Sequence, residues 1–265
     1  MDFDVTDFNV RLRTIRIREL AIAIIVAFSI GLILAYIFPG LEDNEIIVFP
    51  ILLAILLFFA WALRGTHGLS DNFSKIREEE NRKEIIYVFL INILFAFIVV
   101  ALFSNLDIFY GLLYPDNIPM LDMTPEYIDP FTFLLESISS IIFAPVIEEL
   151  VFRGVLFNRL KIRTGVIVAM LISSAIFALG HEVGGITSAF LFGMCMCVIY
   201  LKTDNILMSM SIHFINNLVA VILEGTGFDM YLFQMPLAPI TLIISIISGL
   251  LIIVYIYQNY KALTT

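Results

Sequence analysis

The residues best suited to chemistry are six polar side chains in three short motifs, each set within an apolar segment. They are Glu148, Glu149 and Arg153, then His181, then His213 and Asn217. An ionisable side chain at membrane depth is energetically expensive and is a functional-site hypothesis by default. A carboxylate, two imidazoles and an amide suit the activation of water and the stabilisation of an oxyanion.

In the first motif the two glutamates are expected to have different roles. Glu149 and Arg153 are four residues apart, so they share a helix face and can form an ion pair. Glu148 points about 100° away around the helix and has no partner on its own helix. Pro145 removes a backbone hydrogen bond to the carbonyl of Ile141, and a kink there would open the helix beside Glu148. The alternative is that both glutamates only lock neighbouring helices together.

The other two motifs are ambiguous when each is taken alone. Phe177 and His181 share a helix face, but a lone buried histidine is more often a satisfied core residue than a catalyst. His213 and Asn217 also share a face, and both residue types commonly form interhelical hydrogen bonds in membranes. It is the combination of all three motifs that favours a reaction site.

The composition requires these motifs to lie in a membrane protein. Of the 265 residues, 60% are apolar and 15% are charged, against about 25% charged in an ordinary soluble domain. The mean hydropathy is +0.99, which excludes a soluble enzyme and a disordered chain. A net charge of −9 argues against a nucleic-acid partner. Cys195 and Cys197 do not share a helix face, so we expect core residues rather than a disulfide or a metal pair.

Eight apolar segments approach the length of about 20 residues that a bilayer core requires. The fourth is expected to continue to about Asn158. The segments are Leu20–Phe38, Ile46–Leu63, Ile85–Phe103, Phe131–Ile147, Val166–Gly180, Ile186–Leu201, Asn205–Leu223 and Met230–Tyr257.

The distribution of lysine and arginine predicts how the segments are oriented. Fourteen of the fifteen basic residues fall in alternate loops and in both tails. Because cytoplasmic loops carry the excess of basic residues, both termini are predicted to be cytoplasmic. The only long outer loop, Ser104–Pro130, contains four prolines and is either a cap over the outer face or a passive connector.

We therefore predict an all-α polytopic membrane protein with eight transmembrane helices. It divides into an N-terminal three-helix region (1–130), a four-helix core with the polar motifs (131–223), and an eighth helix with a tail (224–265).

The order EExxxR, FxxxH and HxxxN on separate apolar helices resembles the CPBP family of intramembrane proteases, also called type II CAAX prenyl proteases or the Abi family. The motifs are complete here, and the resemblance covers about 131–223. It implies that Glu148 is the general base with His181 assisting, that His213 and Asn217 form the oxyanion hole, and that Glu149 and Arg153 support this geometry.

The resemblance also implies a substrate class and a location. The partners are membrane lipid and a peptide or protein cleaved near its C-terminus, with or without a prenyl group, in a site open to the cytoplasm. Bacterial members of the family are linked instead to bacteriocin immunity, peptide maturation or surface-protein display.

Three further alternatives stay open at this point. One is a non-enzymatic immunity or scaffold protein that kept the fold, although the complete motif set argues against it. Buried glutamate and histidine could relay protons in a transporter, although no internal repeat is evident. No cofactor is expected, but zinc is possible, with Glu148, His181 and His213 as ligands, and no HExxH helix supports it. Counted along ideal helices, His213 lies about 12 Å deep and His181 about 24 Å, so their convergence requires the fifth helix to be tilted.

Overall fold

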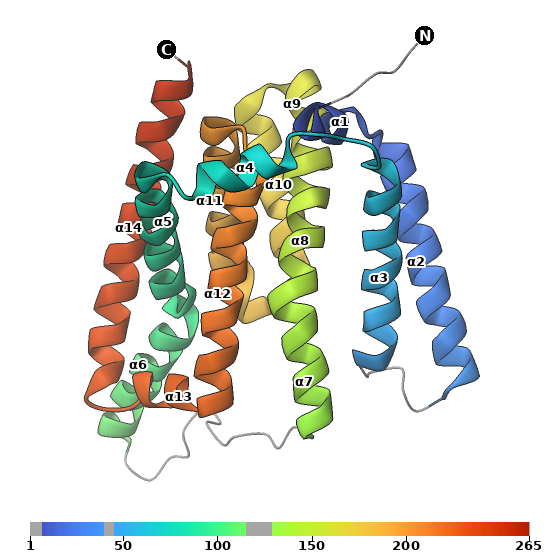
Figure 1. Cartoon of the computed structure of the whole chain (residues 1–265). Coiled ribbons are helices and arrows are strands. Elements are labelled where there is room, and N and C mark those ends of the chain that lie inside the picture. The colour runs from blue at the N-terminus through green and yellow to red at the C-terminus, as the bar shows by residue number, and fades with distance from the viewer. Residues whose placement is uncertain (1–6, 40–44, 115–128, 265) are drawn as a thin grey trace.

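A bundle of long helices lying side by side makes up the structure, which is a computed structural model that describes residues 7–39, 45–114 and 129–264 (Figure 1). Within these ranges the chain is helical and has no β-strand. Among the residues that the structure describes, six helices are long and apolar enough to cross a membrane, and two shorter apolar helices accompany them. The predicted helical polytopic class is confirmed, whereas the count of eight spans stays a prediction.

Helices α2 and α3 pack against each other at one side of the bundle, while α14 at the other side packs against α5, α6 and α11 (Figure 1). The helices of these two groups and the later spans are α2 (Ile17–Ile37), α3 (Glu45–Ala62), α5 (Glu79–Ala96), α6 (Ile98–Leu113), α10 (Val166–Leu179), α11 (Ile186–Thr203), α12 (Ile206–Thr226) and α14 (Leu237–Thr264). A short helix, α13 (Phe228–Leu232), precedes α14.

The fourth span is one uninterrupted run of helix that contains two π-helical segments. Its parts are α7 (Pro130–Ile138), the π-helix η1 (Ser139–Phe143), α8 (Ala144–Glu149), the π-helix η2 (Leu150–Phe157) and α9 (Asn158–Thr164). The predicted end near Asn158 is therefore wrong by about two turns. The helix stops at Gly165, whose φ of 80° is accessible to glycine but unfavourable for other residues.

The third span is also longer than the sequence predicts, because α6 continues to Leu113 instead of ending at Phe103. Within this extension Asn105 donates its Nδ2 to the carbonyl oxygens of Ala101 and Ala238 and is satisfied within the bundle. The expected outer loop is thus shorter. Most of it, 115–128 with three of its four prolines, lies outside the described residues.

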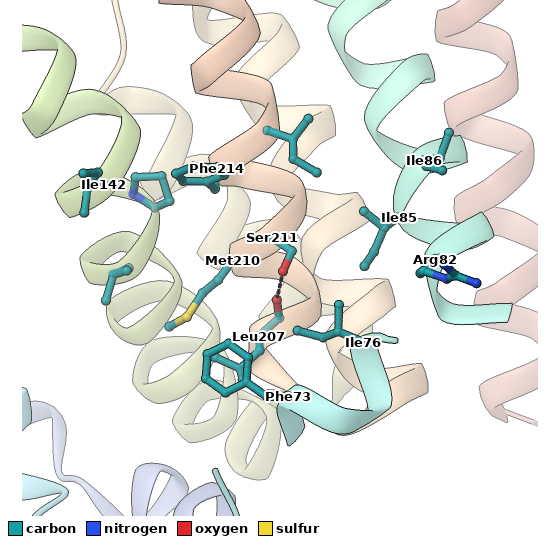
Figure 2. A pocket seen from close by; sticks show the side chains of 13 residues that line it. Phe73, Ile76, Arg82, Ile85, Ile86, Ile142, Leu207, Met210, Ser211 and Phe214 are labelled. Carbon is teal, nitrogen blue, oxygen red and sulfur yellow. Dashed lines mark hydrogen bonds between the residues drawn. The ribbon is translucent and has the colours of Figure 1, made fainter. Parts of the chain in front are cut away.

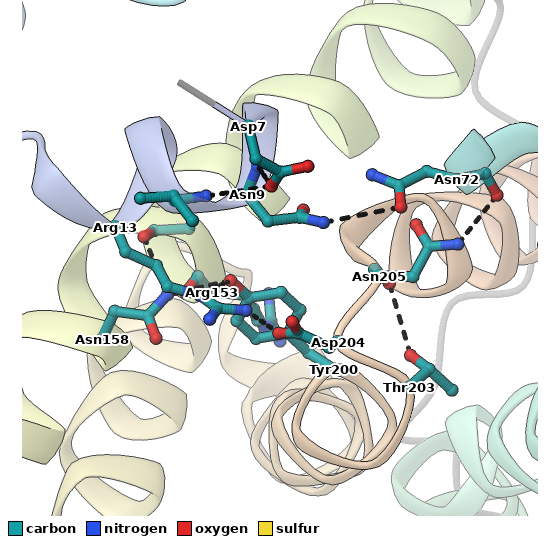
Figure 3. Close-up of polar contacts among 12 residues, drawn as sticks. Asp7, Asn9, Arg13, Asn72, Arg153, Asn158, Tyr200, Thr203, Asp204 and Asn205 are labelled. Atoms are coloured by element: carbon teal, nitrogen blue, oxygen red, sulfur yellow. Dashed lines mark hydrogen bonds and ion pairs between the residues drawn. The ribbon is translucent and has the colours of Figure 1, made fainter. Parts of the chain in front are cut away.

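Two short helices that the sequence did not indicate, α1 (Phe8–Thr14) and α4 (Leu69–Ile76), lie at the end of the bundle where the termini are found (Figure 1). Asparagine side chains connect them to the spans (Figure 3). Asn205, before α12, donates to the Asn72 carbonyl at 2.8 Å, and Asn9 donates to the Asn72 side chain at 3.5 Å. These contacts hold α1 and α4 across the bundle end.

A second set of contacts at the same end joins α1, α9 and α11. Asn158 Nδ2 donates to the Tyr200 hydroxyl at 3.0 Å, and Arg13 Nε donates to the same hydroxyl at 3.3 Å (Figure 3). Cys195 and Cys197 lie deeper in α11 and are fully buried, which confirms the prediction that they are core residues.

The topology prediction is tested by labelling single cysteines in a chain that lacks the two native ones. A cysteine at Asn117 should react with a membrane-impermeant maleimide in intact cells, whereas one at Ser70 should react only after permeabilisation. Labelling of Ser70 in intact cells would contradict cytoplasmic termini.

Candidate active site

The charged pair predicted from the spacing of the first motif is present and completely buried. Glu149 Oε1 lies 2.9 Å from Arg153 Nη1, and both side chains are at most 1% exposed. Arg153 Nη2 also donates to the Gly193 carbonyl at 3.3 Å, and the guanidinium lies 4.5 Å from the centre of the Phe177 ring. The predicted ion pair is confirmed, and α10 and α11 add contacts that the sequence did not reveal.

His213 joins this pair from α12. Its Nδ1 lies 3.1 Å from Glu149 Oε1, the same oxygen that accepts from Arg153. An ionised carboxylate can only accept hydrogen bonds, so Nδ1 carries the proton in this contact. The other ring nitrogen, Nε2, faces Glu148 with a distance of 3.7 Å to Oε2. His213 therefore lies between the two glutamates.

The two glutamates differ sharply in their access to solvent or substrate. The Glu148 side chain is 31% exposed, whereas Glu149 is fully buried. Of Glu148, Glu149 and Arg153, Glu148 is the one whose side chain is exposed enough to contact a water or substrate molecule. The ion-pair contact of Glu148 given above is with His213 on α12 and not with a residue of its own helix.

Pro145 changes the register of the helix beside Glu148. The Ala144 N–H bonds to the Ser139 carbonyl, a π-type i→i−5 bond, and in this register the Ser140 carbonyl would need an N–H from residue 145. Proline has none, and the Asn217 side chain donates to the Ser140 carbonyl instead, at 2.8 Å. The expected kink is thus a π-segment with a carbonyl that α12 satisfies.

His181 lies close to this group without a direct polar contact to it. Its ring is exposed at the end of α10, and Nδ1 lies 3.0 Å from the Phe177 carbonyl. No hydrogen bond or ion pair within the described part of the chain joins His181 to Glu148 or His213. The Phe177 ring contacts both imidazoles, with centroid distances of 4.7 Å to His181 and 5.9 Å to His213.

The motif phenylalanine is therefore a structural centre of the site. Phe177 is buried and contacts Arg153, His181 and His213, and Phe192 packs edge-to-face on His213 with a centroid distance of 5.0 Å. The sequence indicated only that Phe177 shares a face with His181. Contacts between different helices carry no signal in sequence spacing.

The zinc ligand set that the sequence left open is not assembled in this conformation. Among the described residues, no three His, Cys, Asp or Glu side chains are grouped so that they could hold a metal ion.

An apolar groove of about 590 Å³ opens between α4, α5, α8 and α12 (Figure 2). Pro145 and Val146 line it from α8, two or three residues before Glu148, and Phe214 lines it from α12, next to His213. The groove therefore begins within a helical turn of both side chains and could hold an apolar portion of a substrate.

One comparison with known proteins gave a match. Residues 130–219 match a family model described as type II CAAX prenyl endopeptidase Rce1-like. Comparisons with curated proteins and with solved structures gave no match. The matched segment runs from α7 into α12 and contains all six polar residues of the three motifs, so the resemblance inferred from those motifs is confirmed.

Proposed function

We propose, from the match of residues 130–219 to the type II CAAX prenyl endopeptidase Rce1-like family, that the chain is an intramembrane endopeptidase of the CAAX-processing type. Its substrate is a peptide or protein cut near its C-terminus. The observation that carries the proposal is the pairing of a half-buried carboxylate, Glu148, with an imidazole nitrogen 3.7 Å away on another helix.

Glu148 acts as the general base in this proposal. One water molecule can contact both Glu148 Oε2 and His213 Nε2 at ordinary hydrogen-bond lengths, because the two atoms are 3.7 Å apart. Glu148 takes a proton from this water as its oxygen attacks the peptide carbonyl. The C–N bond of the tetrahedral intermediate then breaks, the leaving amine receives the proton from Glu148, and the new carboxylic acid loses its own proton to solvent.

Glu149 and Arg153 act as positioning residues. The buried guanidinium fixes the Glu149 carboxylate, and Glu149 in turn fixes the orientation of the His213 ring through Nδ1. Because Nδ1 of His213 is bonded to Glu149, the other ring nitrogen, Nε2, is the one that faces Glu148. A loss of either residue would release the imidazole from that orientation.

His213 and Asn217 form the oxyanion hole in this proposal. They lie one turn apart on α12, and the Asn217 amide has a second N–H besides the one that bonds to the Ser140 carbonyl. His213 can donate from Nε2 only when both ring nitrogens carry protons. His181 is assigned to assist Glu148, and a shift at the exposed end of α10 would bring it closer once substrate binds.

We expect Asn217→Ala to lower kcat by about 10²–10³-fold, the usual loss for one oxyanion donor. Substrate binding should change little, because the donor acts mainly in the transition state. The second contact of Asn217 complicates this test, since the variant also leaves the Ser140 carbonyl without its donor.

The double variant Pro145→Ala/Asn217→Ala separates the two roles. An alanine at 145 restores a backbone N–H that can satisfy the Ser140 or Ile141 carbonyl within the helix. Thermal stability should then recover relative to Asn217→Ala while kcat stays low. Recovery of kcat together with stability would reassign Asn217 to holding the helix.

The substrate is tested with synthetic C-terminal peptides in liposomes that contain the purified chain. A prenylated peptide and its unprenylated counterpart are compared, because the apolar groove beside Glu148 is lined by residues that suit an isoprenoid chain. We expect a lower KM for the prenylated peptide. Cleavage of neither peptide by a folded chain would contradict the CAAX-type assignment.

A direct glutamate mechanism predicts that the active protein needs no stoichiometric metal. We expect elemental analysis of active preparations to find much less than one zinc per chain, and strong chelators to leave the activity unchanged. One zinc per active chain, with activity lost on chelation and restored by zinc, would replace the direct mechanism with zinc catalysis.

A further inference from the structure

We propose that the chain binds the phosphate of an anionic phospholipid in a cavity between the start of α2 and the end of the fourth span. The cavity has a volume of about 590 Å³ and lies at the end of the bundle that carries both termini. It is lined by four arginines and two isoleucines: Arg16, Arg18, Arg159, Arg163, Ile17 and Ile162.

The arginines leave a large positive charge that the protein does not neutralise. Only one carboxylate within the described residues approaches them, Glu19, and it lies 4.0 Å from Arg16 Nε. Arg18 and Arg163 are exposed and form no ion pair in the part of the chain that is described. Four positive charges against one negative charge around a single cavity favour an anion as occupant.

Arg159 is held in place rather than left free. Its Nε donates to the Ile15 carbonyl at 2.8 Å, and its Nη2 donates to the Thr14 carbonyl. These bonds tie α9 to the segment before α2 and fix the guanidinium at the cavity. Arginine binds phosphate oxygens with particular geometric fit, so a fixed guanidinium suits a phosphate better than a diffuse charge does.

The apolar neighbours indicate a lipid rather than a soluble anion. Ile17 is 43% exposed and Ile162 is 74% exposed, and beyond Glu19 the α2 sequence continues without a charge to Phe38. A phospholipid places its phosphate at the boundary between charged and apolar surface. Basic pockets between membrane helices are known to bind such headgroups.

The test measures lipid-dependent thermal stability of the full chain in a non-ionic detergent. Dioctanoyl phosphatidylglycerol is titrated against dioctanoyl phosphatidylcholine, which has the same acyl chains and no net charge, and against inorganic phosphate. The double variant Arg18→Gln/Arg163→Gln removes the two exposed charges that form no ion pair within the described residues. The matched control, Arg64→Gln/Arg77→Gln, removes two exposed arginines elsewhere on the chain.

We expect saturable stabilisation of the wild type by phosphatidylglycerol and much weaker stabilisation by phosphatidylcholine. The double variant should weaken the apparent affinity by about 25-fold, since one basic residue near an anionic surface contributes about a factor of five. The control should retain wild-type affinity, and both variants should melt near the wild-type temperature without lipid.

Three results would overturn the proposal. Equal affinity for the two lipids would show that the acyl chains alone bind. An equal loss in the control pair would show that general surface charge attracts the lipid. Stabilisation by inorganic phosphate as strong as that by phosphatidylglycerol would assign the cavity to a soluble phosphate.

Discussion

Replacing Glu148 by glutamine is expected to lower kcat by about 10²–10⁴-fold, the contribution typical of a general base, without lowering the melting temperature. Glutamine keeps the size of the side chain and its capacity to contact His213, but it cannot accept a proton from water. Glu148 is 31% exposed and has no charged partner on its own helix, so its replacement breaks no buried ion pair. Peptide binding should persist and can be measured by fluorescence anisotropy.

The controls for this prediction use the same chemical change at two other positions. Glu182→Gln removes an exposed carboxylate at the end of α10 and should leave kcat and stability near wild type. Glu149→Gln should lower both, because Arg153 and His213 share its Oε1 as partner. A Glu148→Gln variant that keeps at least a tenth of wild-type kcat would remove Glu148 from the role of base.

Replacing Arg153 by alanine is expected to destabilise the folded chain by about 3–5 kcal/mol, the loss typical when one partner of a buried ion pair is removed. Arg153 is fully buried and contacts Glu149, the Gly193 carbonyl and the Phe177 ring. The variant leaves the Glu149 carboxylate buried and opposed by no guanidinium. Activity should fall as well, because Glu149 orients His213.

The measurement is the melting temperature in detergent, with Arg77→Ala as the control for loss of an exposed arginine. The double variant Arg153→Leu/Glu149→Leu supplies a second test, because it removes both charges at once. It should be more stable than Arg153→Ala but inactive, since His213 loses its Nδ1 partner. An Arg153→Ala variant that melts at the wild-type temperature would contradict the structural role of the pair.

The sequence predicts those features of the fold that depend on residues close together in the chain. The apolar segments are helical as expected, and the i,i+4 spacing of Glu149 and Arg153 gives the ion pair that was predicted. Helix ends are predicted less well. The apolar segment predicts an end at Phe103, but α6 continues to Leu113, and Asn105 is satisfied there by the carbonyls of Ala101 and Ala238.

The parts of the site that join different helices are not accessible from the sequence. The contact of His213 with both glutamates depends on how α12 packs against α8, and no spacing rule links residues 64 or 65 positions apart. The bond from Asn217 to Ser140 also requires the π-register of η1, which Pro145 permits but does not by itself specify. The polar site residues can be recognised from the sequence because they interrupt apolar helices. Their partners on other helices are known only from the packing of those helices.

The most direct test of Glu148-dependent peptide hydrolysis is cleavage in water enriched in ¹⁸O, with the products weighed by mass spectrometry. A prenylated C-terminal peptide is incubated in liposomes with the wild type and, in parallel, with Glu148→Gln. We expect the wild type to release a C-terminal fragment and to place one ¹⁸O in the new carboxyl group, and Glu148→Gln to form at most about a hundredth as much of this labelled product in the same time. No fragment from the folded wild type, or equal labelled product from both proteins, would contradict hydrolysis by water that Glu148 activates.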